Sequence, residues 1–133
     1  MSPLESSGTA GTTRVRILLV EDNEAASKGL ARLLEASGYD VTSATTGEEA
    51  LAHLQGSPPD FLLTDLQLPD IDGRELALKA RELSPPPRVI LITGWDVEAD
   101  EQACASWGVD CLLTKPLDIQ SLLKALRGPE SPD

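Results

Sequence analysis

Acidic, hydroxyl and ammonium side chains follow four apolar runs of the sequence. The runs end in Glu21-Asp22, Asp65, Thr93 and Lys115. Three carboxylates held close together repel one another, and a hard cation that prefers oxygen ligands, such as Mg²⁺ or Ca²⁺, relieves that repulsion. A carboxylate can also accept a phosphoryl group, while an ammonium and a hydroxyl can stabilise the oxygens of the group in transfer. These residue types predict cation-assisted phosphoryl chemistry, provided that the four runs lie side by side.

Each of these groups carries little information when taken alone. A Glu-Asp pair is usually a solvated turn or a helix cap, and a Lys-Pro pair such as Lys115-Pro116 is usually a turn. Their conjunction at the ends of different apolar runs is what points to a functional site. His53, by contrast, lies near polar residues and is interpreted as a surface histidine.

The apolar runs have the length and composition of strands, and helical patterns separate them. Buried strands are predicted at 16–20, 61–63, 89–92 and 111–113, and an alternating, half-exposed strand at 39–42. Helices are predicted over 26–34 and after a capping box at 46–49. A third helix is predicted to begin at a cap at Asp72, to extend through Leu83 and to stop at Pro85. The last two are predicted over 97–107, with Gly108 at the end, and after a cap at Asp118.

Strict alternation of five strands and five helices predicts an α/β fold with a doubly wound parallel sheet. The strand order 2-1-3-4-5 fits best because it puts the alternating strand at an edge, which is the flavodoxin-like arrangement. Ligands of such sheets bind beyond the carboxyl ends of the strands, where the polar groups lie. We expect one domain at 14–128, a flexible tail at 1–13 and a short tail at 129–133.

Composition excludes several classes of function. The formal net charge is −11, from 22 acidic and 11 basic residues, which argues against direct binding to nucleic acid or to an anionic membrane. No apolar run approaches the roughly 20 residues needed for membrane insertion, and the N-terminus lacks a signal core, so we expect a cytoplasmic protein. Cys104 and Cys111 are too few and too poorly spaced for a metal site or a disulfide framework, which favours buried thiols.

Four segments resemble the signature segments of response-regulator receiver domains, the chemotaxis-regulator-like switches of two-component phosphorelay systems. The segments are ILLVEDN at 17–23, TDLQLPDIDG at 64–73, ITG at 92–94 and LTKP at 113–116. They occur in the order and at the spacing of that family, and the resemblance covers nearly the whole chain.

The resemblance implies a role for each residue of the metal site. Asp22 and Asp65 would bind Mg²⁺ directly, and the backbone carbonyl of Gln67 would be a third protein ligand. Glu21 would orient a metal-bound water. No other cofactor is expected.

The resemblance also assigns the phosphoryl chemistry. Asp65 would be the phosphoacceptor, Lys115 would pair with its carboxylate and then with the phosphoryl oxygens, and Thr93 would move to bond the phosphoryl group. The Lys115-Pro116 bond is expected to be cis. Gly73 would close the turn after the acceptor loop.

Two positions near the site carry further hypotheses. The family often has an aromatic switch residue three positions before the lysine, where this sequence has Leu112. We therefore expect only a small change on the face of the fourth helix, fifth strand and fifth helix upon activation. Gln67 and Trp95 would flank the phosphoryl group, and a large indole can restrict the attacking water, which predicts slow self-dephosphorylation. An indole that simply lies on the surface remains an equal alternative.

The function implied by the resemblance is a phosphorylation-dependent signalling switch rather than an enzyme with its own substrate. Its phosphodonor would be a sensor histidine kinase or a histidine phosphotransfer protein, and its target an unknown downstream protein. The main alternative is a receiver-fold scaffold that works without phosphorylation, although such domains usually lose the acceptor or the lysine. A phosphatase would need Asp-x-Asp, and Gln67 occupies the second position. The sequence leaves open whether the chain acts alone or within a hybrid kinase.

Overall fold

Five parallel strands form one sheet in the computed structural model, which describes residues 14–94 and 101–127. The strands are β2 (Arg16–Val20), β3 (Asp40–Ala44), β4 (Phe61–Asp65), β5 (Arg88–Thr93) and β6 (Cys111–Thr114). Their order across the sheet is β3-β2-β4-β5-β6, which is 2-1-3-4-5 in chain order. The predicted flavodoxin-like topology is confirmed, with the alternating strand at one edge.

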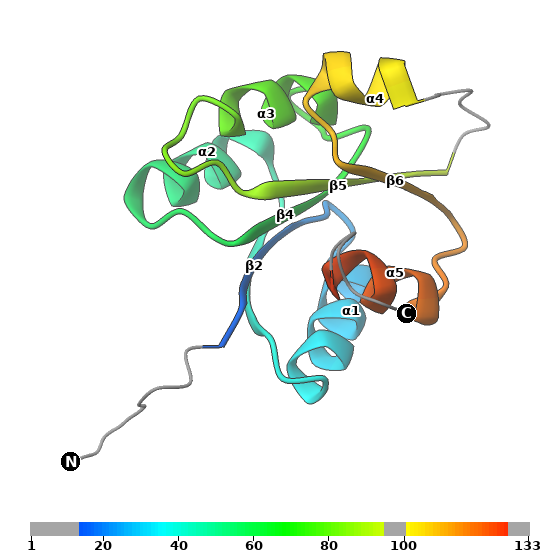
Figure 1. The fold of residues 1–133 in the computed structure, drawn as a ribbon. Coiled ribbons are helices and arrows are strands. Elements are labelled where there is room, and N and C mark those ends of the chain that lie inside the picture. Colours follow the sequence, from blue (N-terminus) through cyan, green and yellow to red (C-terminus); the bar gives the residue numbers. More distant parts are fainter. Residues whose placement is uncertain (1–13, 95–100, 128–133) are drawn as a thin grey trace.

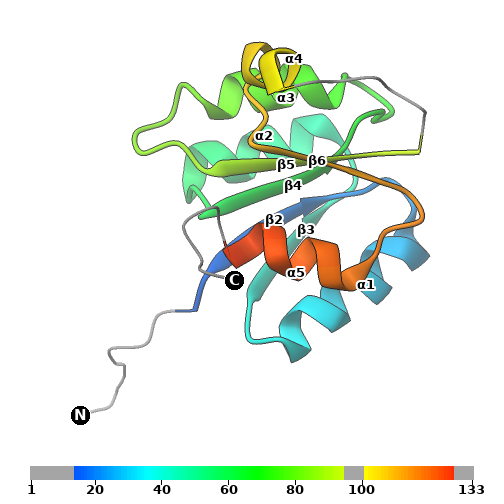
Figure 2. The same ribbon diagram turned by 45° about the vertical axis from the view of Figure 1, so that its right-hand side comes forward.

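Five helices of the described residues cover both faces of this sheet (Figures 1 and 2). They are α1 (Glu24–Ala36), α2 (Gly47–Gly56), α3 (Gly73–Ala80), α4 (Glu101–Trp107) and α5 (Ile119–Arg127). Helices α1 and α5 lie on one face, while α2, α3 and α4 lie on the other. The arrangement follows from right-handed crossovers between parallel strands.

Alternate side chains of the central strands divide the core into two clusters. Leu18 and Val20 of β2 pack toward α2 and α3, whereas Ile17 and Leu19 pack toward α1 and α5. Strands buried on both faces read as continuous apolar runs, which explains why the sequence revealed them. The edge strand β3 is exposed along most of its length.

The two cysteines, one on α4 and one on β6, line the same surface hollow. Cys104 packs with the cluster under α2 and α3, and Cys111 packs with the cluster under α1 and α5. Both are half-buried rather than fully buried as predicted. Their placement agrees with two ordinary packing thiols.

Helix and strand ends differ from the predicted bounds at a few places. Strand β3 covers 40–44 rather than 39–42. Helix α3 ends at Ala80, and Leu83 follows in a tight turn, in which its amide donates to the Ala80 carbonyl at 3.1 Å. Leu83 still packs against the core, so its apolar spacing was informative although the helix had ended.

The predicted helix caps are largely confirmed. The Thr46 hydroxyl accepts from the Glu49 amide at 3.1 Å, and the Asp72 carboxylate accepts from the Arg74 amide at 2.7 Å. Asp118 accepts from the Gln120 amide at 3.3 Å.

Two further end signals can be compared with the structure. The second half of the predicted capping box is displaced by one residue, because the Glu49 carboxylate accepts from the amide of Thr45. Gly108 follows α4 at φ +77°, the left-handed conformation that suits a glycine after a helix. The first part of the predicted helix at 97–107 lies outside the described residues.

Among residues 14–94 and 101–127, none of the helices combines the length and the apolar character needed to cross a membrane. The tails predicted at 1–13 and 129–133 lie outside the described residues.

Candidate functional site

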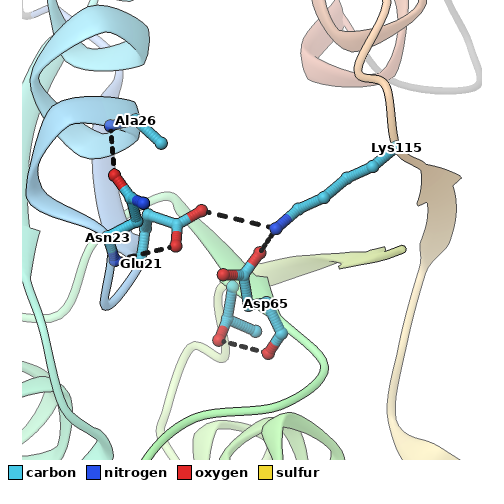
Figure 3. Close-up of polar contacts among 6 residues, drawn as sticks. Glu21, Asn23, Ala26, Asp65 and Lys115 are labelled. Carbon is cyan, nitrogen blue, oxygen red and sulfur yellow. Dashed lines mark hydrogen bonds and ion pairs between the residues drawn. The ribbon is translucent and has the colours of Figure 1, made fainter. Parts of the chain in front are cut away.

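The carboxyl ends of four strands bring the predicted site residues to one edge of the sheet. Glu21 directly follows β2, Asp65 is the last residue of β4, Thr93 is the last residue of β5, and Lys115 directly follows β6. The parallel register sets Asp65 beside Ile92 of the neighbouring strand, so the carboxyl ends of β4 and β5 lie at the same height in the sheet. Figure 3 shows Glu21, Asp65 and Lys115 pointing toward one another.

An ion pair joins the predicted acceptor to the predicted lysine. The Lys115 Nζ atom lies 3.2 Å from Asp65 Oδ1 and 3.6 Å from Glu21 Oε1. Asp65 is 6% exposed and Glu21 is 8% exposed, whereas the Lys115 side chain is 45% exposed. Two nearly buried carboxylates therefore share one ammonium that reaches in from the solvent side.

Burial shifts the acid–base properties of this group. Burial, and then the neighbouring Glu21, raise the pKa of the Asp65 carboxyl from 3.8 to about 7, although Lys115 opposes the shift. Burial acts in the same direction on Glu21, but hydrogen bonds with Asp65 and the Asn23 amide, together with Lys115, hold the pKa of Glu21 below its ordinary value. Partial burial of Lys115 is outweighed by both carboxylates, which raise its pKa and keep it charged.

The carboxylates fit a hard cation. Glu21, Asp22 and Asp65 each bring one carboxylate oxygen within 4.8 Å of the others. Burial and the nearby Glu21 raise the pKa of the Asp65 carboxyl, so a positive charge placed beside these two carboxylates would favour the ionised form of Asp65. An oxygen-only donor set under mutual repulsion suits Mg²⁺.

A hollow of about 470 Å³ opens beside these carboxylates. Its lining combines the ends of β4 and β5 with the loop after β4: it includes Asp22, Asp65, Leu66, Gln67, Leu68, Pro69, Ile92, Thr93, Gly94 and Lys115. The structure therefore brings the three predicted direct ligands, which include the acceptor, together with the hydroxyl and the ammonium, to one solvent-accessible space, while Glu21 lines a neighbouring groove. Thr93 is 1% exposed, so its side chain belongs to the buried wall of that space.

The loop at 66–73 turns back on itself next to the acceptor. Gln67 and Asp72 oppose each other as an antiparallel bridge. The Gly73 amide donates to the Leu66 carbonyl at 2.6 Å, and the Leu68 amide donates to the Ile71 carbonyl at 3.3 Å.

This pairing has two consequences for the site. Neither of its hydrogen bonds uses the Gln67 carbonyl, which remains available for a ligand role. Gly73 closes the loop through its amide, as predicted. The position requires a glycine, because a Cβ atom there would overlap the Asp65 carbonyl oxygen.

The remaining predicted features of the site can also be located. The Lys115-Pro116 peptide is cis, as predicted, and Ser84-Pro85 is a second cis bond that the sequence did not suggest. Leu112 is half-buried in β6 and packs with the cluster under α2 and α3. His53 is exposed, as expected for a surface histidine. Trp95 lies outside the described residues, so the shielding hypothesis stays a prediction.

Sequence reasoning missed two side chains that make polar contacts next to the site. Asn23 caps α1, since its Oδ1 accepts from the Ala26 amide at 2.9 Å, and its own amide donates to Glu21 Oε2 at 3.0 Å (Figure 3). An asparagine before a helical pattern was a usable signal. Asp70, which binds the start of α2, had no local signal because its partners are distant in the sequence.

Comparison with known sequences gives a consistent result. The family model described as the response regulator receiver domain matches residues 17–127. The transcriptional regulatory protein TrcR of Mycobacterium tuberculosis is 34% identical over 114 residues, which are 86% of this chain and 44% of TrcR. The alkaline phosphatase synthesis transcriptional regulatory protein PhoP of Bacillus subtilis is also 34% identical over 114 residues, 84% of this chain and 48% of PhoP. This chain thus spans less than half the length of these two relatives.

A third relative has a length close to the matched region. The response regulator receiver protein CpdR of Brucella abortus is 35% identical over 111 residues, which cover 84% of this chain and 92% of CpdR. Among solved structures, a CheY-like receiver domain from Methylobacillus flagellatus superposes with a TM-score of 0.78 at 30% identity, covering 86% of this chain and 98% of that one. A CheY-like receiver domain from Methanospirillum hungatei gives a TM-score of 0.79 at 32% identity, covering 86% and 92%.

Proposed function

The chain belongs to the response regulator receiver domain family, and we propose that it is a signalling switch which accepts a phosphoryl group on Asp65. The observation that carries the proposal is the nearly buried Asp65 carboxylate, paired with Lys115 at 3.2 Å on the wall of an open hollow. Such a carboxylate is accessible to a donor on one side and fixed by the sheet on the other. Family membership supports this role for the acceptor.

Residues of two strand ends and one loop would hold Mg²⁺. Asp22 and Asp65 would bind it through carboxylate oxygens, Gln67 through its backbone carbonyl, and Glu21 through a bound water. The ion would supply positive charge that offsets the carboxylates and the oxygens of the incoming group. The cluster of carboxylate oxygens within 4.8 Å supports this assignment.

The protein's own residues would then divide the transfer step among them. An Asp65 carboxylate oxygen forms a bond to phosphorus while the bond from phosphorus to the donor's histidine nitrogen breaks, and the electron pair returns to the imidazole. The Lys115 ammonium pairs first with the Asp65 carboxylate and then with the phosphoryl oxygens, so it stabilises the negative charge that moves between them. The Thr93 hydroxyl donates a hydrogen bond to the phosphoryl group once it is attached.

A protein phosphodonor is supported by an apolar groove beside the site. The groove has a volume of about 310 Å³ and lies between α1 and the segment that leads into α5. Its lining includes Leu30, Leu33, Leu117 and Ile119, next to Glu21 and Lys115. A histidine kinase or histidine phosphotransfer protein of the cytoplasm would present its phosphohistidine over this groove.

Signal output would go to a protein target rather than directly to nucleic acid. The net charge of −11 disfavours contacts with phosphate backbones. Leu112 is half-buried on the strand between α4 and α5, where the family often has an aromatic residue. We propose that this face changes little on activation, which chemical shifts recorded with and without a phosphoryl mimic would test; a large rearrangement would contradict it.

Phosphorylation by a small-molecule donor tests the proposed function. The protein would be incubated with Mg²⁺ and acetyl phosphate, and intact mass would report one added phosphoryl group. Asp65→Asn and EDTA should each abolish the gain. If neither acetyl phosphate nor a panel of histidine kinases labels the protein, a phosphorylation-independent scaffold is the better assignment.

A further inference from the structure

Asp70 connects the loop after the acceptor strand to the start of a different helix. Its Oδ1 accepts from the Gly47 amide at 2.8 Å, and its Oδ2 accepts from the Glu48 amide at 2.9 Å. Gly47 and Glu48 are the first two residues of α2. One exposed carboxylate at the tip of the loop therefore binds two amides of the first turn of α2.

Helix α2 is capped from two separate segments. The first amides of a helix have no partner within it and are normally satisfied by the residue just before the helix. Here Thr46 accepts from Glu49 alone, and Asp70 takes the two preceding amides. The positive end of the helix dipole adds to this attraction. The hydrogen bond from the Gly47 amide, and to a smaller extent the one from the Glu48 amide, lowers the pKa of the Asp70 carboxyl.

Close packing accompanies these hydrogen bonds. A Cβ atom on Gly47 would overlap the side chain of Ile71, the residue after Asp70. The loop thus lies directly against the backbone at the start of α2, with no room for a side chain between them. Contact of this kind fixes the position of the loop tip as well as its distance from the helix.

The same loop carries the proposed ligand at its other end. Gln67 lines the hollow beside Asp65, and the bridge between Gln67 and Asp72 closes the neck of the loop. Two backbone hydrogen bonds, one of them at 3.3 Å, close this neck, and on one side of it the Leu66 amide donates to the Ile92 carbonyl at 2.8 Å. None of these hydrogen bonds involves the Gln67 carbonyl itself, and the anchored tip of the loop adds a further constraint on its direction.

We propose that Asp70 is a positioning residue, whose attachment to α2 holds the loop at 66–73 so that the Gln67 carbonyl faces the carboxylates. The inference rests on the proposed function for the identity of the cation. Its structural part, that Asp70 fixes the loop, does not depend on any metal. The two parts can therefore fail separately.

Amide exchange in metal-free protein tests the structural part. Asp70→Ala removes both acceptors, and Asp70→Asn keeps one. Thr46→Ala is the matched control, because it removes a cap hydrogen bond from the same helix without touching the loop. Asp70→Ala should speed exchange of the Leu68 amide by about tenfold, through local opening of the loop, with Asp70→Asn in between and Thr46→Ala near the wild type. Wild-type exchange in Asp70→Ala, or equal acceleration in Thr46→Ala, would overturn the inference.

Calorimetric titration with Mg²⁺ alone tests the link to the site. Asp70→Ala should weaken Mg²⁺ binding by about tenfold, the range seen when residues that orient metal ligands are removed, and Thr46→Ala by less than about twofold. Equal weakening in both variants would mean that α2 stability, and not loop position, governs binding. If the wild type binds no Mg²⁺, the metal site of the proposed function is wrong, and the exchange measurement alone decides whether Asp70 positions the loop.

Discussion

Replacing Asp65 with asparagine should stabilise the metal-free protein at neutral and alkaline pH. The folded protein raises the pKa of Asp65 to about 7, against 3.8 for the ordinary group. The fold therefore favours the protonated carboxyl and penalises the ionised one. As pH rises from about 4 to about 7, the wild type loses stability at this residue, because the unfolded chain releases its proton first.

The size of the effect follows from the pKa difference. About 3 pH units at about 1.4 kcal/mol each give an upper limit of about 4 kcal/mol for the penalty above pH 7. Asp65 is 6% exposed, but water in the open hollow beside it screens part of the charge and lowers this limit. The introduced asparagine is uncharged and can still donate a hydrogen bond to Glu21, as the protonated acid does. We expect Asp65→Asn to raise the free energy of unfolding by about 2–4 kcal/mol at pH 8.

Urea unfolding in EDTA at pH 4.5 and pH 8 measures this difference. Other carboxylates titrate over the same range in both proteins, and subtracting variant from wild type removes their contribution. The stabilisation by Asp65→Asn should be small at pH 4.5 and large at pH 8. Added Mg²⁺ should then stabilise the wild type and leave Asp65→Asn almost unchanged, since binding to the native state alone raises stability.

Two results would refute the reasoning. A stability difference that does not change between the two pH values would show that burial does not set the acidity of Asp65. A wild type that is more stable than Asp65→Asn at pH 8 in EDTA would show that the ion pair with Lys115 outweighs burial. The slopes of the urea transitions must agree between the two proteins for either conclusion to hold.

Two further substitutions test the loop and the groove. Gly73→Ala should destabilise the protein by about 2–4 kcal/mol, because its Cβ would overlap the Asp65 carbonyl and force the backbone to move. Gly29→Ala is its control, since open space surrounds Gly29 within a helix, and urea unfolding should show a stability gain of about 0.5–1 kcal/mol. Leu33→Lys should slow phosphotransfer from a phosphohistidine protein by about tenfold but leave labelling by acetyl phosphate unchanged. Leu78→Lys, on α3, should leave both rates unchanged, and equal loss in the two leucine variants would exclude the groove as the docking site.

The sequence predicted the sheet because its strands are buried on both faces. Continuous apolar runs such as ILLV at 17–20 leave few alternatives to a central parallel strand. Once the strands are parallel, polar residues at their carboxyl ends must meet at one edge, and this placed Glu21, Asp65 and Lys115 together. The chemistry of the candidate site was therefore predictable from hydrophobic pattern and residue type.

Features that depend on contacts between distant segments were not predictable in the same way. The end of α3 at Ala80 depends on a backbone turn, and the apolar spacing continues to Leu83 beyond it. The attachment of Asp70 to α2 joins a loop to the start of a helix, and the separation of these two segments in the sequence says nothing about their distance in space. Asn23 lies between these cases, because its position before a helix is a local signal that the prediction overlooked.

The candidate site is destabilised by its own charges and is held in place by the rest of the fold. Glu21 and Asp65 are buried side by side, and one ammonium from Lys115 only partly compensates them. The apolar clusters on both faces of the sheet supply the stability that such an arrangement costs. A cation bound among these carboxylates would relieve repulsion that the fold already opposes, so its binding should depend strongly on how well the loop beside Asp65 is held. The fold thus holds the ionised Asp65 at an electrostatic cost, and Asp70 holds the neighbouring loop in position. Both features keep the site arranged before any ligand binds.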